Sequence, residues 1–522
     1  MNLGTLLTKS ARTCGDHVAL VHGAKHRTYR EFNARANRLA NALCRLGVRK
    51  GDHVAILQYN ELETLEALFA CFKAGCAAVP INFRLHPREF AFIIDHSECK
   101  AAIFSREFND PIREVQASLP KVQQFVALEG ARGGLLDYEA VLSVESDYWV
   151  DADVQPDDVA WLFYTSGTTG SPKGAMLTHR NLLAMTMNFF ADMAPLGPGD
   201  AILHAAPLSH GSGLYAIPNV AKAATNVILP TRSFDPEAVC RAIEEHRITN
   251  MFVAPTMLKV LVESPWVDRF DLSSMRCLNY GGGPMYVEDL KKAIDKLGPC
   301  LVQLFGQGES PMTITYLPTR DHVTRGTSEQ MGRLASAGIA RTDVEVKIVD
   351  DDGNELPQGC VGEIVTRSDL VMAGYWNNPE ATDAALRGGW LHTGDVGYLD
   401  GQGYLFIMDR SKDMIITGGE NVYPRELEEV LLRHPAVREV AVIGVPDAKW
   451  GETITAHVVC SPGVAVSEEA LIAFCKNHLA SYKKPKKVVF VSELPKNNYG
   501  KILKSSTVIS SHKYVRKLSW GA

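Results

Sequence analysis

The chain has 522 residues, which is too long for one hydrophobic core and predicts two to four domains. Hydrophobic residues make up 46% and charged residues 22%, as in an ordinary globular protein, and the net charge of −6 gives no electrostatic reason to bind nucleic acid. The cysteines number eleven, an odd count, and they form no Cys-x-x-Cys pair. This usage indicates reduced thiols and a cytoplasmic protein.

The start of the chain does not resemble a signal peptide, because Met1–Thr5 lacks a basic segment followed by an apolar one. The most apolar helix-length stretch runs from Leu65 to Ile81, but Glu66 and Lys73 interrupt it and Pro80 breaks it. We expect a core helix there and no transmembrane segment. Peripheral membrane contact and a homodimer stay open.

The first 400 residues alternate between helix-like and strand-like segments. Amphipathic periodicity predicts helices at 29–46 and 61–74. Short apolar runs near turn signals predict strands at 54–57, 77–80, 101–104 and 124–128. The same alternation covers 201–304, and 344–365 is mostly β. The pattern is that of an α/β protein, with sheets covered by helices.

The strand predicted at 159–163 leads into a loop that is rich in glycine and hydroxyl groups, Tyr164–Asn181. Glycines let the backbone N–H groups approach an anion, while hydroxyls and a lysine add donors and charge. The spacing is not that of a Walker loop, because no Ser or Thr follows the lysine. The loop therefore predicts a polyphosphate site. Its expected ATP-binding residues are Thr165, Ser166, Gly167, Thr168, Thr169, Gly170 and Lys173.

A domain boundary is predicted near 409–413, a polar junction between strands at 404–408 and 414–416. A helix at 424–434 follows. A junction of five residues is short for a flexible linker and suits a hinge. We expect a large domain at 1–408, the hinge at 409–413 with Lys412, and a small α+β domain at 414–522.

The loop resembles the signature of the adenylate-forming (AMP-binding) superfamily, which contains acyl-CoA synthetases, peptide-synthetase adenylation domains and firefly luciferases. Further matches follow in the order of that family and cover nearly the whole chain. They are Thr28–Phe32, Pro207–His210, Gly281–Pro284, Phe305–Glu309, Gly374–Glu380, Trp390–Asp395, Asp409–Asp413, Gly418–Asn421 and Gly500–Ile502. The resemblance implies a large N-terminal domain of α/β subdomains with a β-rich subdomain, and a small mobile α+β C-terminal domain.

The resemblance also implies that the chain activates a carboxylic acid with ATP. The carboxylate attacks the α-phosphate and pyrophosphate leaves; since both reactants are anionic, the site needs positive charge and a divalent cation. Glu309 is the expected Mg²⁺ ligand and Thr165 adds a hydroxyl. Lys501 is the lysine expected to bridge the carboxylate and the α-phosphate. His210 is expected at the mouth of the acyl pocket.

Other residues are expected to bind the nucleotide, the acyl group and coenzyme A. Asp395 and Arg410 suit the ribose, Gly282, Gly283 and Pro284 would pass under the adenine, and Phe305 and Gly306 are also expected to bind ATP. Phe252, Gly281 and Gly306 would line the acyl pocket with His210, and Gly418, Gly419 and Glu420 would line the path of coenzyme A. One departure matters: the usual Tyr-Gly-x-Thr-Glu is here Phe305–Glu309, without the tyrosine hydroxyl and the threonine.

Three functions fit this family. The first is an acyl-CoA synthetase, the second an adenylating enzyme that loads a carrier protein, and the third a luciferase-like oxygenase. No carboxylate follows His210 to pair with the ammonium of an amino acid, which disfavours amino-acid adenylation. We favour an acid–CoA ligase for a medium- or long-chain fatty acid, because Gly306 stands where acetate-specific relatives carry a tryptophan. An aromatic or cyclic acid is the alternative.

Overall fold

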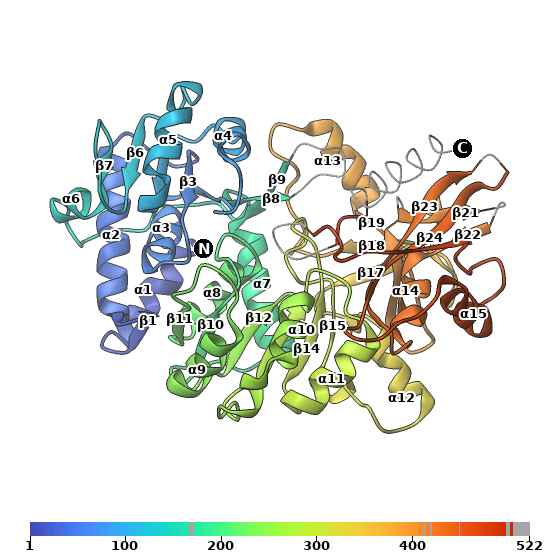
Figure 1. Cartoon of the computed structure of the whole chain (residues 1–522). Coiled ribbons are helices and arrows are strands. Elements are labelled where there is room, and N and C mark those ends of the chain that lie inside the picture. The colour runs from blue at the N-terminus through green and yellow to red at the C-terminus, as the bar shows by residue number, and fades with distance from the viewer. Residues whose placement is uncertain (166–171, 411–412, 418–419, 448, 497–501, 505–522) are drawn as a thin grey trace.

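The computed structural model describes residues 1–165, 172–410, 413–417, 420–447, 449–496 and 502–504. Two large sheets form most of the molecule (Figure 1). The seven-stranded sheet has the order β7-β6-β5-β3-β4-β8-β9, and all its neighbours are parallel except β8 and β9. Its strands are β3 His53–Leu57, β4 Ala77–Pro80, β5 Ala101–Phe104, β6 Gln124–Ala127, β7 Leu136–Asp137, β8 Val159–Thr165 and β9 Lys173–Thr178.

The nine-stranded sheet has the order β16-β15-β14-β13-β12-β10-β11-β1-β2. Its middle strands are parallel, and β2, β15 and β16 run antiparallel to their neighbours. Its strands are β1 Val18–His22, β2 Lys25–Thr28, β10 Ala201–His204, β11 Thr225–Ile228, β12 Asn250–Val253, β13 Cys277–Gly281, β14 Leu301–Phe305, β15 Thr315–Leu317 and β16 Ile339–Ala340.

Helices cover both sheets, as buried parallel strands require. The large domain contains α1 Gly4–Thr13, α2 Tyr29–Arg45, α3 Leu62–Ala74, α4 Pro87–His96, α5 Asn109–Val115, α6 Tyr138–Ser143, α7 His179–Asp192, α8 Gly211–Ala221, α9 Pro236–His246, α10 Pro255–Glu263, α11 Val287–Leu297, α12 Ser328–Gly332 and α13 Pro379–Ala385. Helix α8 is buried almost throughout and packs against strands β10–β12 and helices α1 and α7. It therefore forms part of the wall between the two sheets.

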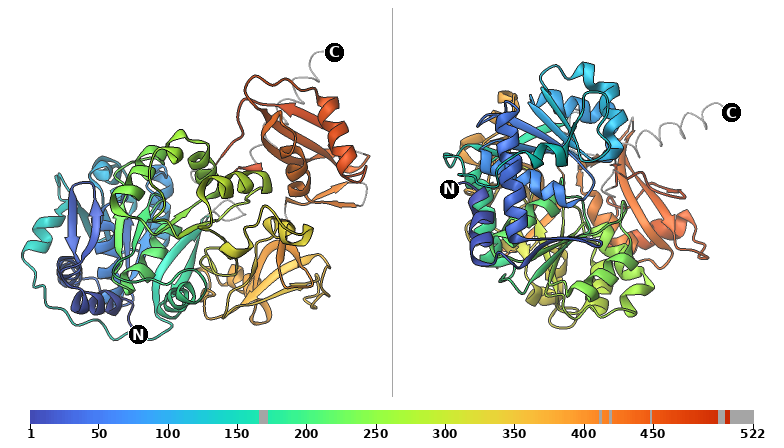
Figure 2. Two further views of the ribbon diagram at one scale, coloured as in Figure 1. Left: turned by 90° about the horizontal axis from the view of Figure 1, so that it is seen from below. Right: turned by 90° about the vertical axis from the view of Figure 1, so that its left-hand side faces the viewer.

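Two smaller sheets complete the molecule. The four-stranded antiparallel sheet contains β17 Glu345–Val349, β18 Gly362–Arg367, β19 Leu391–Leu399 and β20 Leu405–Arg410. The C-terminal sheet contains β21 Ile415–Thr417, β22 Glu420–Val422, β23 Val437–Asp447, β24 Gly451–Cys460 and β25 Lys487–Phe490, with helices α14 Pro424–Leu432 and α15 Glu468–His478. This small domain has its own hydrophobic core and lies at one end of the molecule (Figure 2).

The predicted α/β class and the division into a large and a small domain are confirmed. Most predicted elements lie within a residue or two of their expected positions. The boundary at 409–413 stays a prediction, since Ser411 and Lys412 lie outside the described residues. The motif that starts at Thr28 has a structural cause: Thr28 caps α2 by accepting a bond from the Glu31 N–H, and Glu31 bonds back to the Thr28 N–H.

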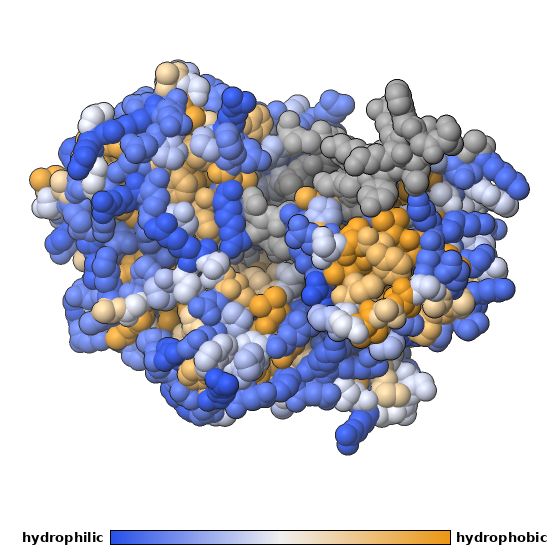
Figure 3. Space-filling view, in the orientation of Figure 1, coloured by the Kyte–Doolittle hydropathy of each residue, from blue (hydrophilic) through white to orange (hydrophobic). Residues whose placement is uncertain are grey.

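Polar residues cover most of the face seen in Figure 3, with an apolar area over the small domain. No helix in the described part of the chain is both long and apolar enough to cross a bilayer. All eleven cysteines are free thiols in the described structure, and Cys360 is the exposed one among them.

Candidate active site

The predicted site residues lie where strands of the two large sheets end. Thr165 ends β8, Gly281 ends β13 and Phe305 ends β14, while His210 follows β10. The carboxyl ends of strands are where open α/β sheets bind ligands. The fold therefore brings residues from 165 to 309 to one edge, although they are distant in sequence.

Glu309 is buried, with 9% of its surface exposed, and two hydroxyls donate to its Oε1. Thr165 Oγ1 lies 3.2 Å from it and the Tyr375 hydroxyl 2.7 Å. Burial and the nearby Glu309 raise the pKa of Tyr375, so its hydroxyl stays protonated and donates. Neither of these bonds uses Glu309 Oε2. A buried carboxylate beside two hydroxyls is a set of hard oxygen donors, which fits Mg²⁺.

Backbone bonds hold the segment 372–376 against this cluster. The Met372 N–H donates to the Glu309 carbonyl (2.8 Å), and the Trp376 N–H to the Gly174 carbonyl (2.8 Å). Lys173 Nζ lies 5.2 Å from the centre of the Tyr375 ring. Tyr375 thus joins the loop after β14 to β9, and Lys173 reaches the same cluster as Glu309.

A second cluster surrounds Asp395 on β19. Arg410 on β20 is paired with Asp395 in register, and its Nε lies 2.9 Å from Asp395 Oδ1. Gln307 Nε2 donates to Asp395 Oδ2 (2.7 Å) and to the Thr393 carbonyl (2.8 Å). Asp395 and Arg410 thus lie together, and their expected role at the ribose stays a prediction. Gln307 fixes the Glu309 loop to the four-stranded sheet.

The unusual sequence of this loop has a packing cause. A Cβ on Gly308 would lie 2.5 Å from Thr165 Cγ2 and 2.8 Å from the Phe163 ring. The threonine usual at this position would therefore push Thr165 away from Glu309. In this chain, glycine at 308 permits the close approach of Thr165.

The glycine-rich turn after β13 presents open space. Gly282 has φ +82°, which favours glycine, and a Cβ there would meet nothing within 4 Å. A Cβ on Gly283 would meet only Pro255, at 4.0 Å. Gly281 differs, because a Cβ there would collide with the Leu304 carbonyl at 2.3 Å. The bare backbone at 282–283 fits a flat ring such as adenine.

The open pocket floor expected at Gly306 is not observed. A Cβ at Gly306 would lie 2.6 Å from Met312 Cα and 2.7 Å from the Thr313 nitrogen. The glycine is needed for close backbone packing, and Met312 itself lies in the left-handed region at φ 63°. The size of the acid therefore cannot be inferred from Gly306.

His210 stands at the N-terminus of α8, where the acyl pocket was expected. Its ring packs edge-on against Phe163, with 4.9 Å between ring centres. Burial lowers the pKa of His210 to about 4, so the imidazole is neutral at pH 7. Phe252 lies close by, because a Cβ on Gly211 would be 2.9 Å from the Phe252 ring and 2.7 Å from Met312 Cε. These groups form an apolar wall.

Sequence reasoning missed Asn60, which holds the loop before His210. Its Nδ2 donates to the Ala206 carbonyl (2.9 Å) and its Oδ1 accepts from the Leu208 N–H (2.8 Å). Asn60 follows β3 of the seven-stranded sheet, and the loop follows β10 of the nine-stranded sheet. Tyr375 and Gln307 were also unassigned, although both stand inside quoted motifs. Only the folded arrangement shows their partners.

Several expected site residues lie outside the described structure. They are Ser166, Gly167, Thr168, Thr169, Gly170, Lys412, Gly418, Gly419 and Lys501. Glu420 is described: it is exposed and opens β22, where it pairs with Thr417. Near Lys501, Lys496 and Ile502 form a β-bridge and the Leu503 N–H donates to the Pro495 carbonyl (2.8 Å). The roles of all these residues stay predictions.

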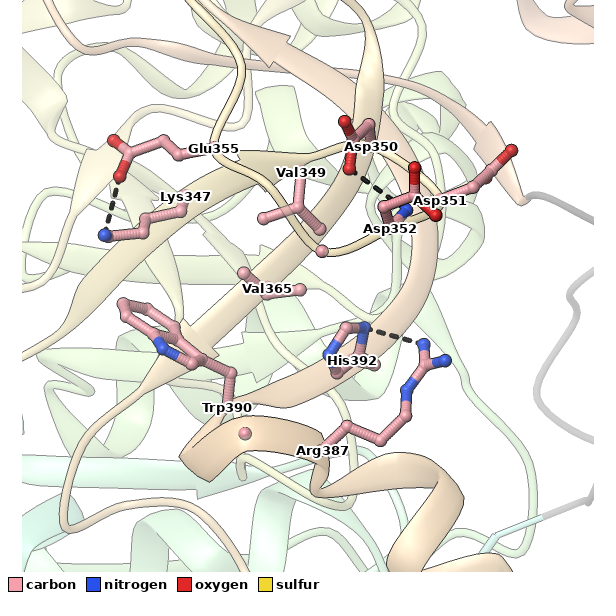
Figure 4. A pocket seen from close by; sticks show the side chains of 12 residues that line it. Lys347, Val349, Asp350, Asp351, Asp352, Glu355, Val365, Arg387, Trp390 and His392 are labelled. Atoms are coloured by element: carbon pink, nitrogen blue, oxygen red, sulfur yellow. Dashed lines mark hydrogen bonds and ion pairs between the residues drawn. The ribbon is translucent and has the colours of Figure 1, made fainter.

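A separate hollow of about 440 Å³ lies over the four-stranded sheet (Figure 4). Trp390 lies beneath Lys347, which pairs with Glu355, and Arg387 contacts His392. The hollow contains none of the predicted site residues, and we assign it no part in the reaction.

The fold and the two clusters together define an adenylate-forming enzyme. The chain belongs to the AMP-binding enzyme family: the family model matches residues 7–376, and the model of the AMP-binding enzyme C-terminal domain matches 426–501. It is 40% identical over 505 residues to a feruloyl-CoA synthase of an Amycolatopsis species, covering 96% of this chain and 97% of the relative. It is 36% identical over 513 residues to the long-chain-fatty-acid–CoA ligase FadD13 of Mycobacterium tuberculosis, covering 97% of both.

Among solved structures, the chain resembles MatB from Rhodopseudomonas palustris in two states. The ATP-bound structure gives a TM-score of 0.88 at 31% identity and covers 99% of this chain and 100% of that one. The apo structure gives 0.79 at 31% identity and covers 98% of both. The arrangement described here is thus closer to the ATP-bound form.

Proposed function

We propose that this protein is an ATP-dependent acid–CoA ligase that forms an acyl-adenylate and then the acyl-CoA thioester, releasing AMP and pyrophosphate. The observation that carries the proposal is the pair of clusters around Glu309 and Asp395, joined by Gln307 at the edge of the two sheets. The relatives named above support the choice of coenzyme A as acceptor.

Each cluster has a task in the first step. Glu309 with Thr165 would hold Mg²⁺, which supplies positive charge to the phosphates when bound. Asp395 and Arg410 would hold the ribose, and the bare backbone at Gly282–Gly283 would accept the adenine. Lys173 and Lys501 would bring further positive charge, Lys501 to the point where the carboxylate meets the α-phosphate.

The neutral His210 suits an apolar acid better than a charged group would. At pH 7 it adds no net charge beside Phe163, Phe252 and Met312, and these side chains leave an apolar wall. We propose a medium- or long-chain fatty acid because of this apolar wall alone, since Gly306 gives no support for it. An aromatic acid fits similarly, since the wall contains aromatic rings and the feruloyl-CoA synthase is 40% identical to this chain.

The test is an acid panel assayed for products. Purified protein, ATP and Mg²⁺ are incubated with fatty and aromatic acids, with and without coenzyme A, and the products are identified by mass. We expect acyl-CoA, AMP and pyrophosphate. ADP and phosphate would overturn the proposal. Acyl-AMP that accumulates with coenzyme A present, but disappears when a carrier protein is added, would favour the carrier-loading alternative.

A further inference from the structure

A buried arginine has no partner in this structure. Arg341, which follows β16, is only 2% exposed. Its Nε, Nη1 and Nη2 make no hydrogen bond to any described residue, and no described carboxylate lies within 4.0 Å of it. A guanidinium cannot lose its proton in a protein, so this charge stays in place without compensation. Such burial is costly unless an acceptor is supplied.

Two acidic residues at this segment, Asp343 in the chain and Asp192 bonded to Thr342, have other partners. Asp192 accepts bonds from the Thr342 N–H and hydroxyl, and Asp343 accepts from the Asn188 amide. The guanidinium instead lies over the Tyr316 ring, 5.2 Å from its centre. The face of an aromatic ring attracts a cation, but it accepts no conventional hydrogen bond from the N–H groups of the guanidinium. The five donors of Arg341 are therefore available to an oxygen acceptor.

A second buried polar group without a partner lies beside it. The Tyr215 hydroxyl has no hydrogen-bond partner among the described residues, and Tyr215 is 1% exposed. Burial raises the pKa of Tyr215, and the Arg341 guanidinium lowers it, both by its charge and by facing the hydroxyl as a donor without reaching hydrogen-bond geometry, so the two side chains are neighbours. Two unsatisfied donors in one buried place point to a shared acceptor.

This place lies at the inner end of the apolar wall. Tyr215 follows Gly211 by one turn of α8, on the same face, and its ring lies 5.9 Å from that of Phe252. Phe189 closes the other side of Tyr215, with 5.2 Å between ring centres. From His210 to Tyr215 the helix rises roughly 7 Å, which is the span of a ring or of a short acyl chain.

We infer that Arg341 and Tyr215 form a selectivity site that binds an oxygen acceptor at the far end of the acid. The inference rests on the proposed function and narrows its substrate class. The acid would carry its reactive carboxylate near His210 and a second oxygen group, a carboxylate or a hydroxyl, roughly 7 Å deeper. Either an aliphatic or an aromatic body satisfies this description. A plain alkyl end would leave both donors unsatisfied.

The test compares acids matched in length. ATP–pyrophosphate exchange is measured with dicarboxylic, terminal-hydroxy and plain monocarboxylic acids of roughly six to ten carbons, and with cinnamic acids that carry a carboxylate, a hydroxyl or a hydrogen at the para position. We expect kcat/KM for the best oxygen-bearing acid to exceed that of its plain partner by about 100-fold. Comparing the acids that carry a distal carboxylate with those that carry a distal hydroxyl identifies which acceptor the site prefers.

Arg341→Met and Tyr215→Phe complete the experiment. Arg341→Met should abolish the preference and leave the KM for ATP unchanged, and Tyr215→Phe should reduce the preference by about tenfold. Equal loss with every acid would mean that Arg341 is structural and would overturn the inference. Wild type that favours plain acids would overturn it even if Arg341→Met does not fold. Wild type that adenylates no acid in the panel counts instead against the proposed function.

Discussion

At the scale of single residues, the contact between Tyr375 and Glu309 gives a direct test of the proposed metal site. Tyr375→Phe removes the 2.7 Å donor to Glu309 Oε1 while keeping the ring beside Lys173. The carboxylate then loses one of the bonds that orient it. We expect the Mg²⁺ concentration for half-maximal activity to rise about three- to tenfold. Initial rates at saturating ATP and acid over a Mg²⁺ titration measure this shift.

Tyr398→Phe is the matched control for this variant. Tyr398 on β19 stacks on Phe406 of β20 and is not part of either cluster. Its Mg²⁺ requirement should equal that of wild type. An unchanged Mg²⁺ requirement in Tyr375→Phe would show that the hydroxyl does not orient the metal ligand.

At the scale of elements, the N-cap residue of α3, Glu61, carries a carboxyl with a perturbed pKa. Burial, and then the charge of Glu63, raises the pKa of Glu61 to about 7, although Ser105 donates to it at 3.1 Å. The folded state therefore binds this proton more tightly than the unfolded chain. The stability contributed by the group is present below pH 4.5 and is lost as the pH rises towards 7.

Glu61→Gln keeps an acceptor for Ser105 and removes the ionisation. We expect it to raise the melting temperature at pH 8, equivalent to about 1–3 kcal/mol, and to change little at pH 4.5. Thermal unfolding at both pH values measures the difference. Glu114→Gln, at an exposed carboxyl, is the control. A gain for Glu61→Gln that is the same at both pH values would contradict this explanation.

Elements of this kind could be predicted well from sequence, but their partners could not. The apolar run 54–57 and the capping pattern at Thr28–Glu31 are local signals, and both structures formed as expected. Asn60 and Gln307 gave no such signal, because their roles depend on loops more than 80 residues away. The prediction of an open pocket floor at Gly306 was wrong for a related reason. The sequence did not show that the Met312 backbone occupies the space where a side chain at 306 would lie.

At the scale of the whole molecule, a buried ionic network ties the small domain to the large one. Lys504 Nζ lies 3.0 Å from Asp409 Oδ2 and 3.2 Å from Glu428 Oε1. Burial alone would lower the pKa of Lys504, but Glu428 and Asp409 outweigh it and the pKa lies above its usual value. Glu428 also accepts from the hydroxyl of Tyr286, in the large domain, at 3.0 Å. Because Lys504 follows Lys501 by three residues, the network anchors the segment that carries the expected catalytic lysine.

Lys504→Met should therefore affect the two half-reactions unequally. Two buried carboxylates lose their cation, which destabilises the domain orientation described here. We expect adenylate formation to fall at least about tenfold, while conversion of supplied acyl-AMP and coenzyme A to acyl-CoA is nearly retained. Single-turnover assays of each step measure this. Lys476→Met, at an exposed position of α15, serves as the control, and equal loss in both steps for Lys504→Met would refute the anchoring role.

Lys501→Ala tests the predicted catalytic lysine in the same assays. Its ammonium would stabilise the negative charge that forms as the carboxylate meets the α-phosphate, so its loss should slow adenylate formation by about 10²–10³. Supplied acyl-AMP should still be converted to acyl-CoA. Lys173 and Asp395 should keep ATP binding close to normal. If both half-reactions were lost equally, Lys501 would be structural.

The distribution of thiols allows one position to be labelled selectively, so that domain movement can be followed during the reaction. Among the eleven cysteines, Cys360 alone is exposed, and burial raises the pKa of thiols such as Cys76, Cys99 and Cys277 to about 12. Since the thiolate is the reactive form, a maleimide dye should label one position rapidly. That position lies in the large domain, between β17 and β18. A second dye on a cysteine introduced into α15 would then report the separation of the two domains by energy transfer as ATP, acid and coenzyme A are added in turn.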